Sequence, residues 1–117
     1  MRHGKSGKRL GRNDDHRRAM LRNLATSFFT YGKVETTVTR AKELSRVASR
    51  LITRAKKGDL QSRRIVAAYL MSPAVAKKVV DVIAPSLSGR NGGYTRIVRT
   101  RVRQGDAAEM AQIELMQ

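Results

Sequence analysis

Residues 37–58 carry apolar side chains at the spacing of one helix face, and this stripe constrains the fold more than any other segment. Thr37 or Thr39 can cap the beginning of this helix, and Gly58 can end it. Cations fill most of the other positions, so one face has to be buried against a second layer. The apolar stripe consists of Ala41, Leu44, Val47, Ala48, Leu51, Ile52 and Ala55.

The segment before this helix predicts another helix and a short strand. The short polar side chains at 13–15 can cap a helix that spans about 15–31, and Gly32 supplies a left-handed stop. Residues 33–37 contain β-favouring valine and threonine in a stretch that is long enough only for a brief strand.

The segment after the central stripe predicts two more helices and a hairpin. Asp59 can cap a third helix, and Ser72-Pro73 places a cap and then a proline at the start of a fourth helix. We expect Pro85 to end that helix. Residues 94–102 favour a strand, and Gln104-Gly105-Asp106 is typical of a hairpin turn.

The last strand alternates apolar Ala111, Ile113 and Leu115 with polar residues, which predicts one buried and one wet face. The predicted order is therefore α-β-α-α-α-β-β. It indicates an α+β fold of two layers, with about four helices packed on a small three-stranded sheet. The chain length fits a single domain, which we place at 14–117, after an N-terminal arm at 1–13.

The chain carries 25 Lys and Arg against nine Asp and Glu, a formal net charge of +16. Charge of one sign repels itself in a compact domain and is neutralised by a polyanion, so nucleic acid is the expected partner. Residues 1–13 combine five cations and three glycines with little apolar surface, which predicts a flexible basic arm that contacts RNA. An ordinary disordered tail is the alternative interpretation.

Residues 90–103 hold five arginines and no acid. In a regular strand Arg99, Arg101 and Arg103 project from one face, where their guanidinium groups can bind phosphates or stack on bases. The turn Asn91-Gly92-Gly93 permits a close approach of the backbone, and Tyr94 is expected to stack on an unpaired base. A solvated edge strand protected by its charge is the alternative.

Cations near the start of the first helix interact unfavourably with the helix dipole, so they do not stabilise the helix. Contact with a binding partner explains them better. For the cations of the second helix, phosphate contact and simple solvation are equal alternatives. The predicted RNA-binding residues are Arg2, His3, Lys5, Lys8, Arg9, Arg12, Arg17, Arg18, Arg22, Arg90, Asn91, Tyr94, Arg96, Arg99 and Arg101.

Catalysis finds little support in the sequence. His3 and His16 have no evident acidic or nucleophilic partner, and Asp14 and Asp15 are explained as helix caps. The absence of cysteine excludes disulfides and cysteine-rich zinc sites. We therefore expect no enzyme, no metal, no cofactor and no small-molecule substrate. The longest apolar runs, of four or five residues, fall far short of the roughly 20 that cross a bilayer, so no membrane partner is expected.

Eight segments spread over the whole chain point to a family. They are MRHGKSGKRLGR (1–12), RNLATS (22–27), GKVETT (32–37), AKEL (41–44), AKKGDL (55–60), IAP (83–85), RNGGYTRI (90–97) and GDAAEM (105–110). In this order they closely resemble the bacterial-type large-subunit ribosomal protein L17 family.

The resemblance implies a two-layer fold, direct binding to large-subunit ribosomal RNA, and neighbouring large-subunit ribosomal proteins. It implies a place on the solvent side of the large subunit, near the exit of the nascent-chain tunnel. It also implies a cytoplasmic, bacterial ribosome, with an organellar ribosome as the alternative, and neither catalysis nor a cofactor. On this basis the cations of the arm and the loop from Arg90 to Arg96 become the foremost expected RNA contacts.

The residues alone leave two other classes of protein open. An architectural DNA-binding protein is the main rival, because attraction to phosphate does not distinguish DNA from RNA. A peripheral protein on anionic membranes is the third possibility, but no expected helix joins a basic face to a bulky Trp or Phe face.

Overall fold

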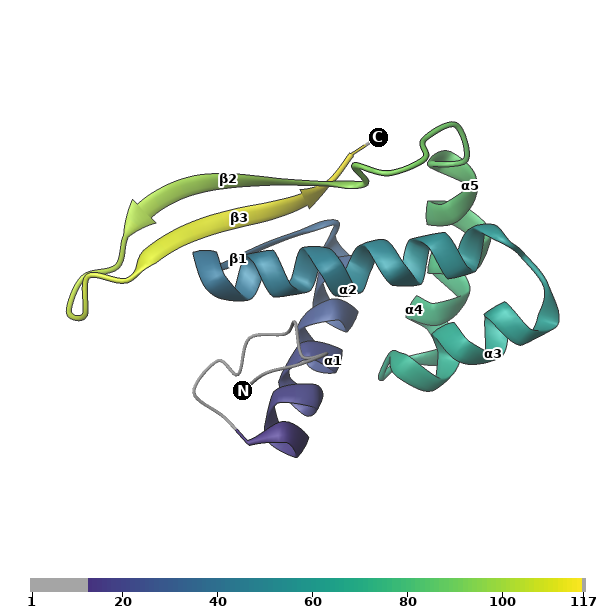
Figure 1. Cartoon of the computed structure of the whole chain (residues 1–117), viewed down its shortest axis with the longest axis horizontal. Helices are drawn as coiled ribbons and strands as arrows, with labels where there is room; N and C mark the ends of the chain where they lie inside the picture. Colours follow the sequence, from purple (N-terminus) through teal and green to yellow (C-terminus); the bar gives the residue numbers. More distant parts are fainter. Residues whose placement is uncertain (1–12, 117) are drawn as a thin grey trace, which may run out of the picture.

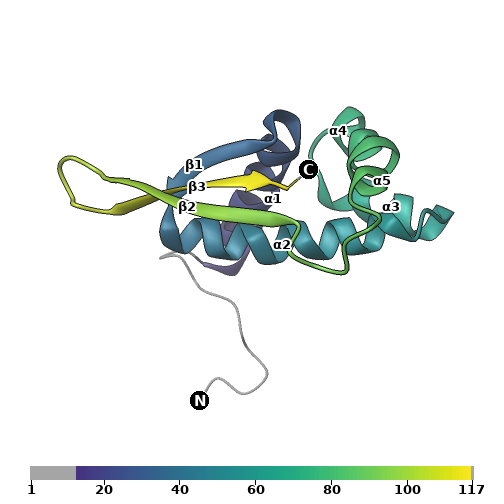
Figure 2. The same cartoon turned by 90° about the horizontal axis from the view of Figure 1, so that it is seen from above.

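The structure is a computed structural model that describes residues 13–116. Helices cover one face of a three-stranded antiparallel sheet (Figures 1 and 2). The elements are α1 (Asp14–Tyr31), β1 (Lys33–Thr37), α2 (Val38–Lys56), α3 (Leu60–Tyr69), α4 (Pro73–Lys78), the π-helical turn η1 (Val79–Ile83), α5 (Ala84–Ser86), β2 (Thr95–Val102) and β3 (Glu109–Leu115). The predicted α+β fold is therefore confirmed. Apart from Asn13, the predicted arm lies outside the described residues.

The first helix has the caps that its sequence predicts. The side chain of Asn13 accepts a hydrogen bond from the backbone N–H of His16 at 2.8 Å. Gly32, with φ of 79°, ends the helix in the left-handed region, and its N–H donates to the carbonyl of Phe28 at 2.7 Å. Because β1 begins at the next residue, α1 leads directly into the sheet.

The second helix lies between the sheet and the other helices (Figure 1). Thr37 caps it by accepting a hydrogen bond from the N–H of Arg40 at 3.4 Å. Its stripe is buried as predicted, apart from the partly buried Val47, and α2 contacts all three strands as well as α1 and α3. The residues of α2 with no exposed surface are Ala41, Leu44, Ala48 and Ile52. The core of the protein is thus built around this one helix.

The sheet has the order β1-β3-β2, so the last strand of the chain lies in the middle. Ile113 of β3 pairs with Val34 of β1 and Ile97 of β2 and is fully buried. Ala111 is buried on the same face, toward the helices, as predicted. The alternation is incomplete, because Met110 on the other face is also buried and Leu115 is only partly buried. No helix of the described residues covers the opposite face of the sheet (Figure 2).

The predicted row of arginines on one face of β2 is wrong. Arg99 pairs with Ala111, whereas Arg101 pairs with the adjacent Met110, so the register shifts at Thr100. This β-bulge inserts one residue and reverses the faces beyond it. Arg99 therefore shares the helix-side face of Ala111, and Arg101 lies on the open face.

The prediction that Pro85 ends the fourth helix is also wrong. The backbone continues from α4 through η1 into α5, and the N–H of Ala84 donates to the carbonyl of Val79, five residues earlier. A proline ring crowds the carbonyl four residues before it, and the wider π-helical turn accommodates Pro85. At the other end Pro73 occupies the first turn as predicted, but the Ser72 side chain makes no capping hydrogen bond within the described residues.

Candidate nucleic-acid interface

The predicted site residues do not form one cluster. The start of α1, which carries Arg17 and Arg18, lies far from the loop between α5 and β2, which carries Arg90 and Asn91 (Figure 1). Arg18, Arg90 and Asn91 are exposed, and Arg17 forms an ion pair with Asp14 at 3.3 Å. The predicted arm residues Arg2, His3, Lys5, Lys8, Arg9 and Arg12 lie outside the described residues.

Arg22 is half-buried and binds the end of α3. Its Nε donates to the carbonyl oxygen of Tyr69 at 2.7 Å, and a terminal nitrogen donates to that of Ala68 at 3.1 Å. The last carbonyls of a helix lack intrahelical partners and carry partial negative charge, so a guanidinium stabilises them. Nearby, Thr26 accepts a hydrogen bond from the N–H of Met71 at 3.0 Å. Arg22 therefore has a structural role in joining α1 to α3, which the sequence did not reveal.

We predict that Arg22→Gln lowers the free energy of unfolding by about 1.5–3 kcal/mol, because hydrogen bonds from a charged donor are lost at a half-buried site. Urea denaturation measures the change. Arg18→Gln, at an exposed position one turn earlier, is the matched control and should change stability by less than about 0.5 kcal/mol. Equal stabilities of the two variants would refute the structural role of Arg22.

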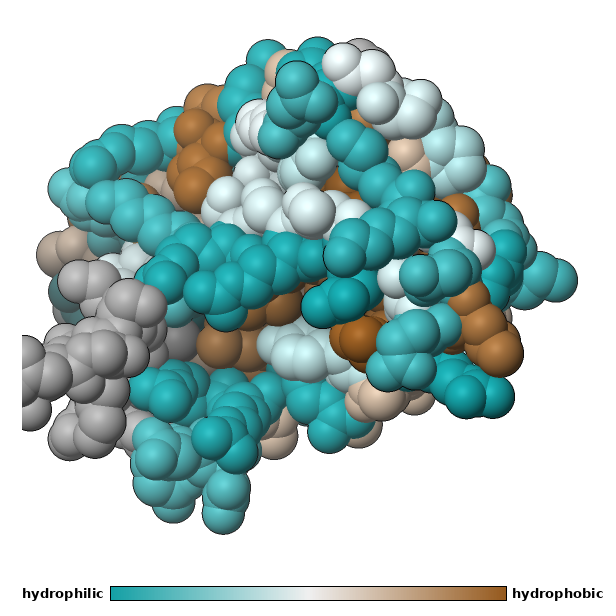
Figure 3. Space-filling model, turned by 45° about the vertical axis from the view of Figure 1, so that its right-hand side comes forward, coloured by the Kyte–Doolittle hydropathy of each residue, from teal (hydrophilic) through white to brown (hydrophobic). Residues whose placement is uncertain are grey.

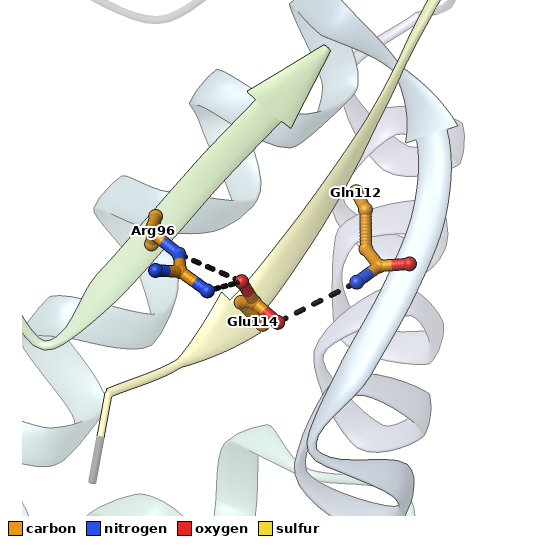
Figure 4. A network of polar contacts seen from close by, with 3 residues as sticks. All are labelled: Arg96, Gln112 and Glu114. Carbon is orange, nitrogen blue, oxygen red and sulfur yellow. Dashed lines mark hydrogen bonds and ion pairs between the residues drawn. The ribbon is translucent and has the colours of Figure 1, made fainter. Parts of the chain in front are cut away.

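Each arginine from Arg96 to Arg103 faces an acid. The carboxylate of Glu114 accepts hydrogen bonds from Arg96, at 2.7 Å for Nε, and from Gln112 at 3.5 Å (Figure 4). The other pairs are Arg99 with Glu109 at 2.6 Å, Arg101 with Glu35 at 3.2 Å and Arg103 with Asp106 at 2.6 Å. Exposed ion pairs contribute little stability, but they balance the charge of β2. The predicted RNA contacts of these arginines stay predictions, and RNA has to compete there with carboxylates.

The turn between β2 and β3 is held by Asp106. Its carboxylate accepts hydrogen bonds from the Arg103 guanidinium, at 2.6 and 3.1 Å, and from the N–H of Ala108 at 3.2 Å. These hydrogen bonds lower the pKa of Asp106 from 3.8 to about 2. The bond from Arg103 has the largest effect, and the bond from Ala108 has the next largest. The ionised carboxylate thus stabilises the turn.

We expect this stabilisation to be complete above pH 3.8 and to be lost as the pH falls through about 2, since the folded pKa lies below the unfolded one. An NMR titration of the Asp106 carboxyl carbon should give a midpoint near 2, and Arg103→Gln should raise this midpoint toward 3.8. A midpoint near 3.8 in the unmodified protein would contradict the arrangement of this turn.

Lys56 and Tyr94 fix the loop that carries Arg90 to the end of α2. The Lys56 ammonium donates to the carbonyl oxygen of Arg90 and, at 3.1 Å, to the hydroxyl of Tyr94, and it lies 5.1 Å from the centre of the Tyr94 ring. Tyr94 is only 3% exposed and belongs to the hydrophobic core. Its ring is covered by protein, so the predicted stacking of Tyr94 on a base, which stays a prediction, requires the ring to leave the core. In the structure Tyr94 helps to position a loop on which Arg90 and Asn91 are exposed.

All nine acids of the chain lie in the described part, and each has a place in an ion pair or at a helix start. Seven form ion pairs with arginine, Asp59 accepts a hydrogen bond from the N–H of Ser62 as the cap of α3, and Asp15 lies in the first turn of α1. The exposed positive charge that has no acidic partner among residues 13–116 lies mainly on helices and loops. It includes Arg18, Lys33, Lys42, Arg50, Arg54, Lys57, Arg64, Lys77 and Arg90.

Hydrophilic side chains dominate the face seen in the space-filling view, and apolar residues appear there only in small patches (Figure 3). The described residues contain no group of three or more His, Asp or Glu side chains arranged to hold a metal ion. Among the same residues, no helix combines the length and apolar character needed to cross a membrane. Fold and charge together define a small, strongly basic α+β protein.

Comparisons with known proteins identify its family. The family model described as "Ribosomal protein L17" matches residues 20–116. A large ribosomal subunit protein bL17 from Fusobacterium nucleatum is 53% identical over 116 residues, which cover 99% of this chain and 100% of the relative. The bL17 of Clostridium acetobutylicum is 54% identical over 109 residues (93% and 96%), and that of Helicobacter hepaticus is 51% identical over 116 residues (99% and 100%).

The chain therefore belongs to the ribosomal protein L17 family, and the resemblance seen in the sequence is confirmed. Members of this family are structural constituents of the large ribosomal subunit rather than enzymes, which also confirms the prediction that this is not an enzyme. The bacterial relatives indicate a ribosomal, cytoplasmic location.

Proposed function

We propose that this protein, as a structural constituent of the large ribosomal subunit, binds large-subunit ribosomal RNA. The observation that carries the proposal is the unbalanced charge of the described surface. Acids neutralise the arginines of β2, while exposed cations such as Arg50, Arg54 and Arg90 have no acidic partner in the described residues. RNA phosphates supply the missing negative charge, and release of their counterions favours binding.

In this proposal, two parts of the chain contact the RNA, namely residues 1–12 and the loop at Arg90 and Asn91. The cations of residues 1–12 neutralise phosphates, and the release of counterions from the RNA favours this contact. The capped start of α1, at Asn13, fixes the point from which this segment leaves the domain. The exposed loop at Arg90 and Asn91 is held against α2 by Lys56, so it meets RNA in a fixed conformation.

The proposal includes neighbouring large-subunit proteins as partners. It also includes a place on the solvent side of the subunit, near the exit of the nascent-chain tunnel. Support for this position comes from the family resemblance alone. The domain contributes the exposed sheet face and the projecting β2–β3 hairpin as surfaces that are free of other described elements (Figure 1).

Single charge removals test RNA binding. We predict that Arg90→Gln reduces the slope of log K against log salt by about 0.7–0.9, the contribution of one phosphate contact. Arg96→Gln should reduce the slope by less, because Glu114 already neutralises Arg96. Binding to deproteinised large-subunit RNA over a salt series measures both slopes. The Arg90 contact is refuted if Arg90→Gln keeps the slope of the unmodified protein.

Competition with duplex DNA at the same ionic strength separates RNA recognition from simple attraction to phosphate. RNA is favoured through its 2′-hydroxyl groups and unpaired bases, so duplex DNA should displace the labelled RNA only at a clear excess. Equal competition by the two polymers would favour the architectural DNA-binding class instead.

A further inference from the structure

We propose that the open groove between α2 and α3 is a separate binding site for the ribose-phosphate backbone of RNA. This inference rests on the proposed RNA-binding function and adds a second surface to the arm and the Arg90 loop. The groove has a volume of about 490 Å³. Its lining residues are Ser49, Arg50, Leu51, Thr53, Arg54, Lys57 and Ile65.

The cations of the groove form a row along α2. Arg50, Arg54 and Lys57 follow each other at intervals of four and three residues, so they share one side of the helix. At a rise of about 1.5 Å per residue, the row is about 10 Å long, which allows contacts with successive phosphates of one strand. All three residues are exposed, and none has an acidic partner within residues 13–116.

Acidic side chains near the groove do not neutralise its three positive charges. Asp59 is the acid whose charge acts on Lys57 and Arg54, but it forms an ion pair with neither of them among the described residues. Its carboxylate instead accepts the hydrogen bond from the N–H of Ser62, at 2.7 Å, that caps α3. One negative charge against three positive charges leaves the groove attractive to a polyanion.

The other lining residues fit a nucleic-acid backbone better than a free ion. Leu51 and Ile65 give the groove an apolar part that suits a ribose ring, and the Ser49 hydroxyl can hydrogen-bond to phosphate or to a 2′-hydroxyl. A second groove, lined by Tyr31, Val82 and other largely apolar residues, offers no comparable charge. Its one cation, Lys78, donates to the carbonyl of Thr30 at 3.0 Å.

Two matched triple variants of the full-length protein test the groove. The groove variant is Arg50→Gln, Arg54→Gln and Lys57→Gln, and the control variant is Lys33→Gln, Lys42→Gln and Lys77→Gln, which removes three exposed charges elsewhere. With deproteinised large-subunit RNA, we expect the salt slope of the groove variant to fall by about 2, at about 0.7 per lost contact. The control variant should lose less than half as much. Thermal unfolding followed by circular dichroism verifies that both variants are folded.

Hydroxyl-radical footprinting adds a second readout. The groove variant should expose one set of nucleotides that the unmodified protein protects, while the remaining protection persists. Equal slopes for the two variants, with an unchanged footprint, would overturn the groove and leave the proposed function intact. Failure of the unmodified protein to bind this RNA would overturn both.

Discussion

Deletion of residues 1–12 is expected to weaken binding to large-subunit RNA about 100-fold or more and to flatten its salt dependence. The deleted segment holds five Lys and Arg residues. At about 0.7–0.9 per phosphate contact, their loss reduces the slope of log K against log salt by about four. The remaining domain keeps its capped first helix and its core, so its thermal stability should change little.

A protease experiment separates RNA binding by this segment from a purely structural role. Trypsin cleaves after Lys and Arg, and the segment offers five such positions. We expect RNA to slow cleavage within residues 1–12 far more than it slows cleavage of the folded domain. Equal protection with and without RNA would count against a segment that binds RNA. A full-length variant with the five cations changed to Gln should reproduce the effect of the deletion.

Replacement of Phe28 by Ala should destabilise the domain by about 3–5 kcal/mol. Phe28 has no exposed surface, and its ring lies 5.3 Å from that of Phe29, tilted by 57°. The pair fills the core beside α2 with two of the few aromatic side chains that the chain has. Since small domains are stable by only about 5–15 kcal/mol, this one change removes a large part of the total.

Urea denaturation measures this loss. Tyr31→Ala is the control, because Tyr31 lies on the same helix but is 76% exposed, and it should change stability by less than about 0.5 kcal/mol. A loss below about 1 kcal/mol for Phe28→Ala would mean that α1 is not packed as described.

Local chemistry made much of the fold predictable. Asn13, Thr37 and Asp59 all cap helices at the predicted places, because a cap depends on residues within one turn of it. The stripe of α2 and the alternation of β3 also follow from spacing along a single element. These signals were sufficient for the order of elements and for the two layers.

Features that depend on pairing between distant segments could not be predicted. The acids that pair with the arginines of β2 come from β1 and β3, so a scan of residues 90–103 for acids does not find them. The bulge at Thr100 depends on how two strands pair, and the burial of Tyr94 depends on packing in a core built from residues far apart in the chain. For the same reason, the sequence did not show which cations of α2 have an acidic partner within residues 13–116.

Sedimentation of affinity-tagged protein from a cell extract, through a gradient at high salt, tests most directly whether the excess cations bind ribosomal RNA. We expect the protein in the fraction of large ribosomal subunits, and we expect a variant without residues 1–12 and without the three groove cations to leave that fraction. Recovery of the unmodified protein mainly as a free species at the top of the gradient would contradict this account.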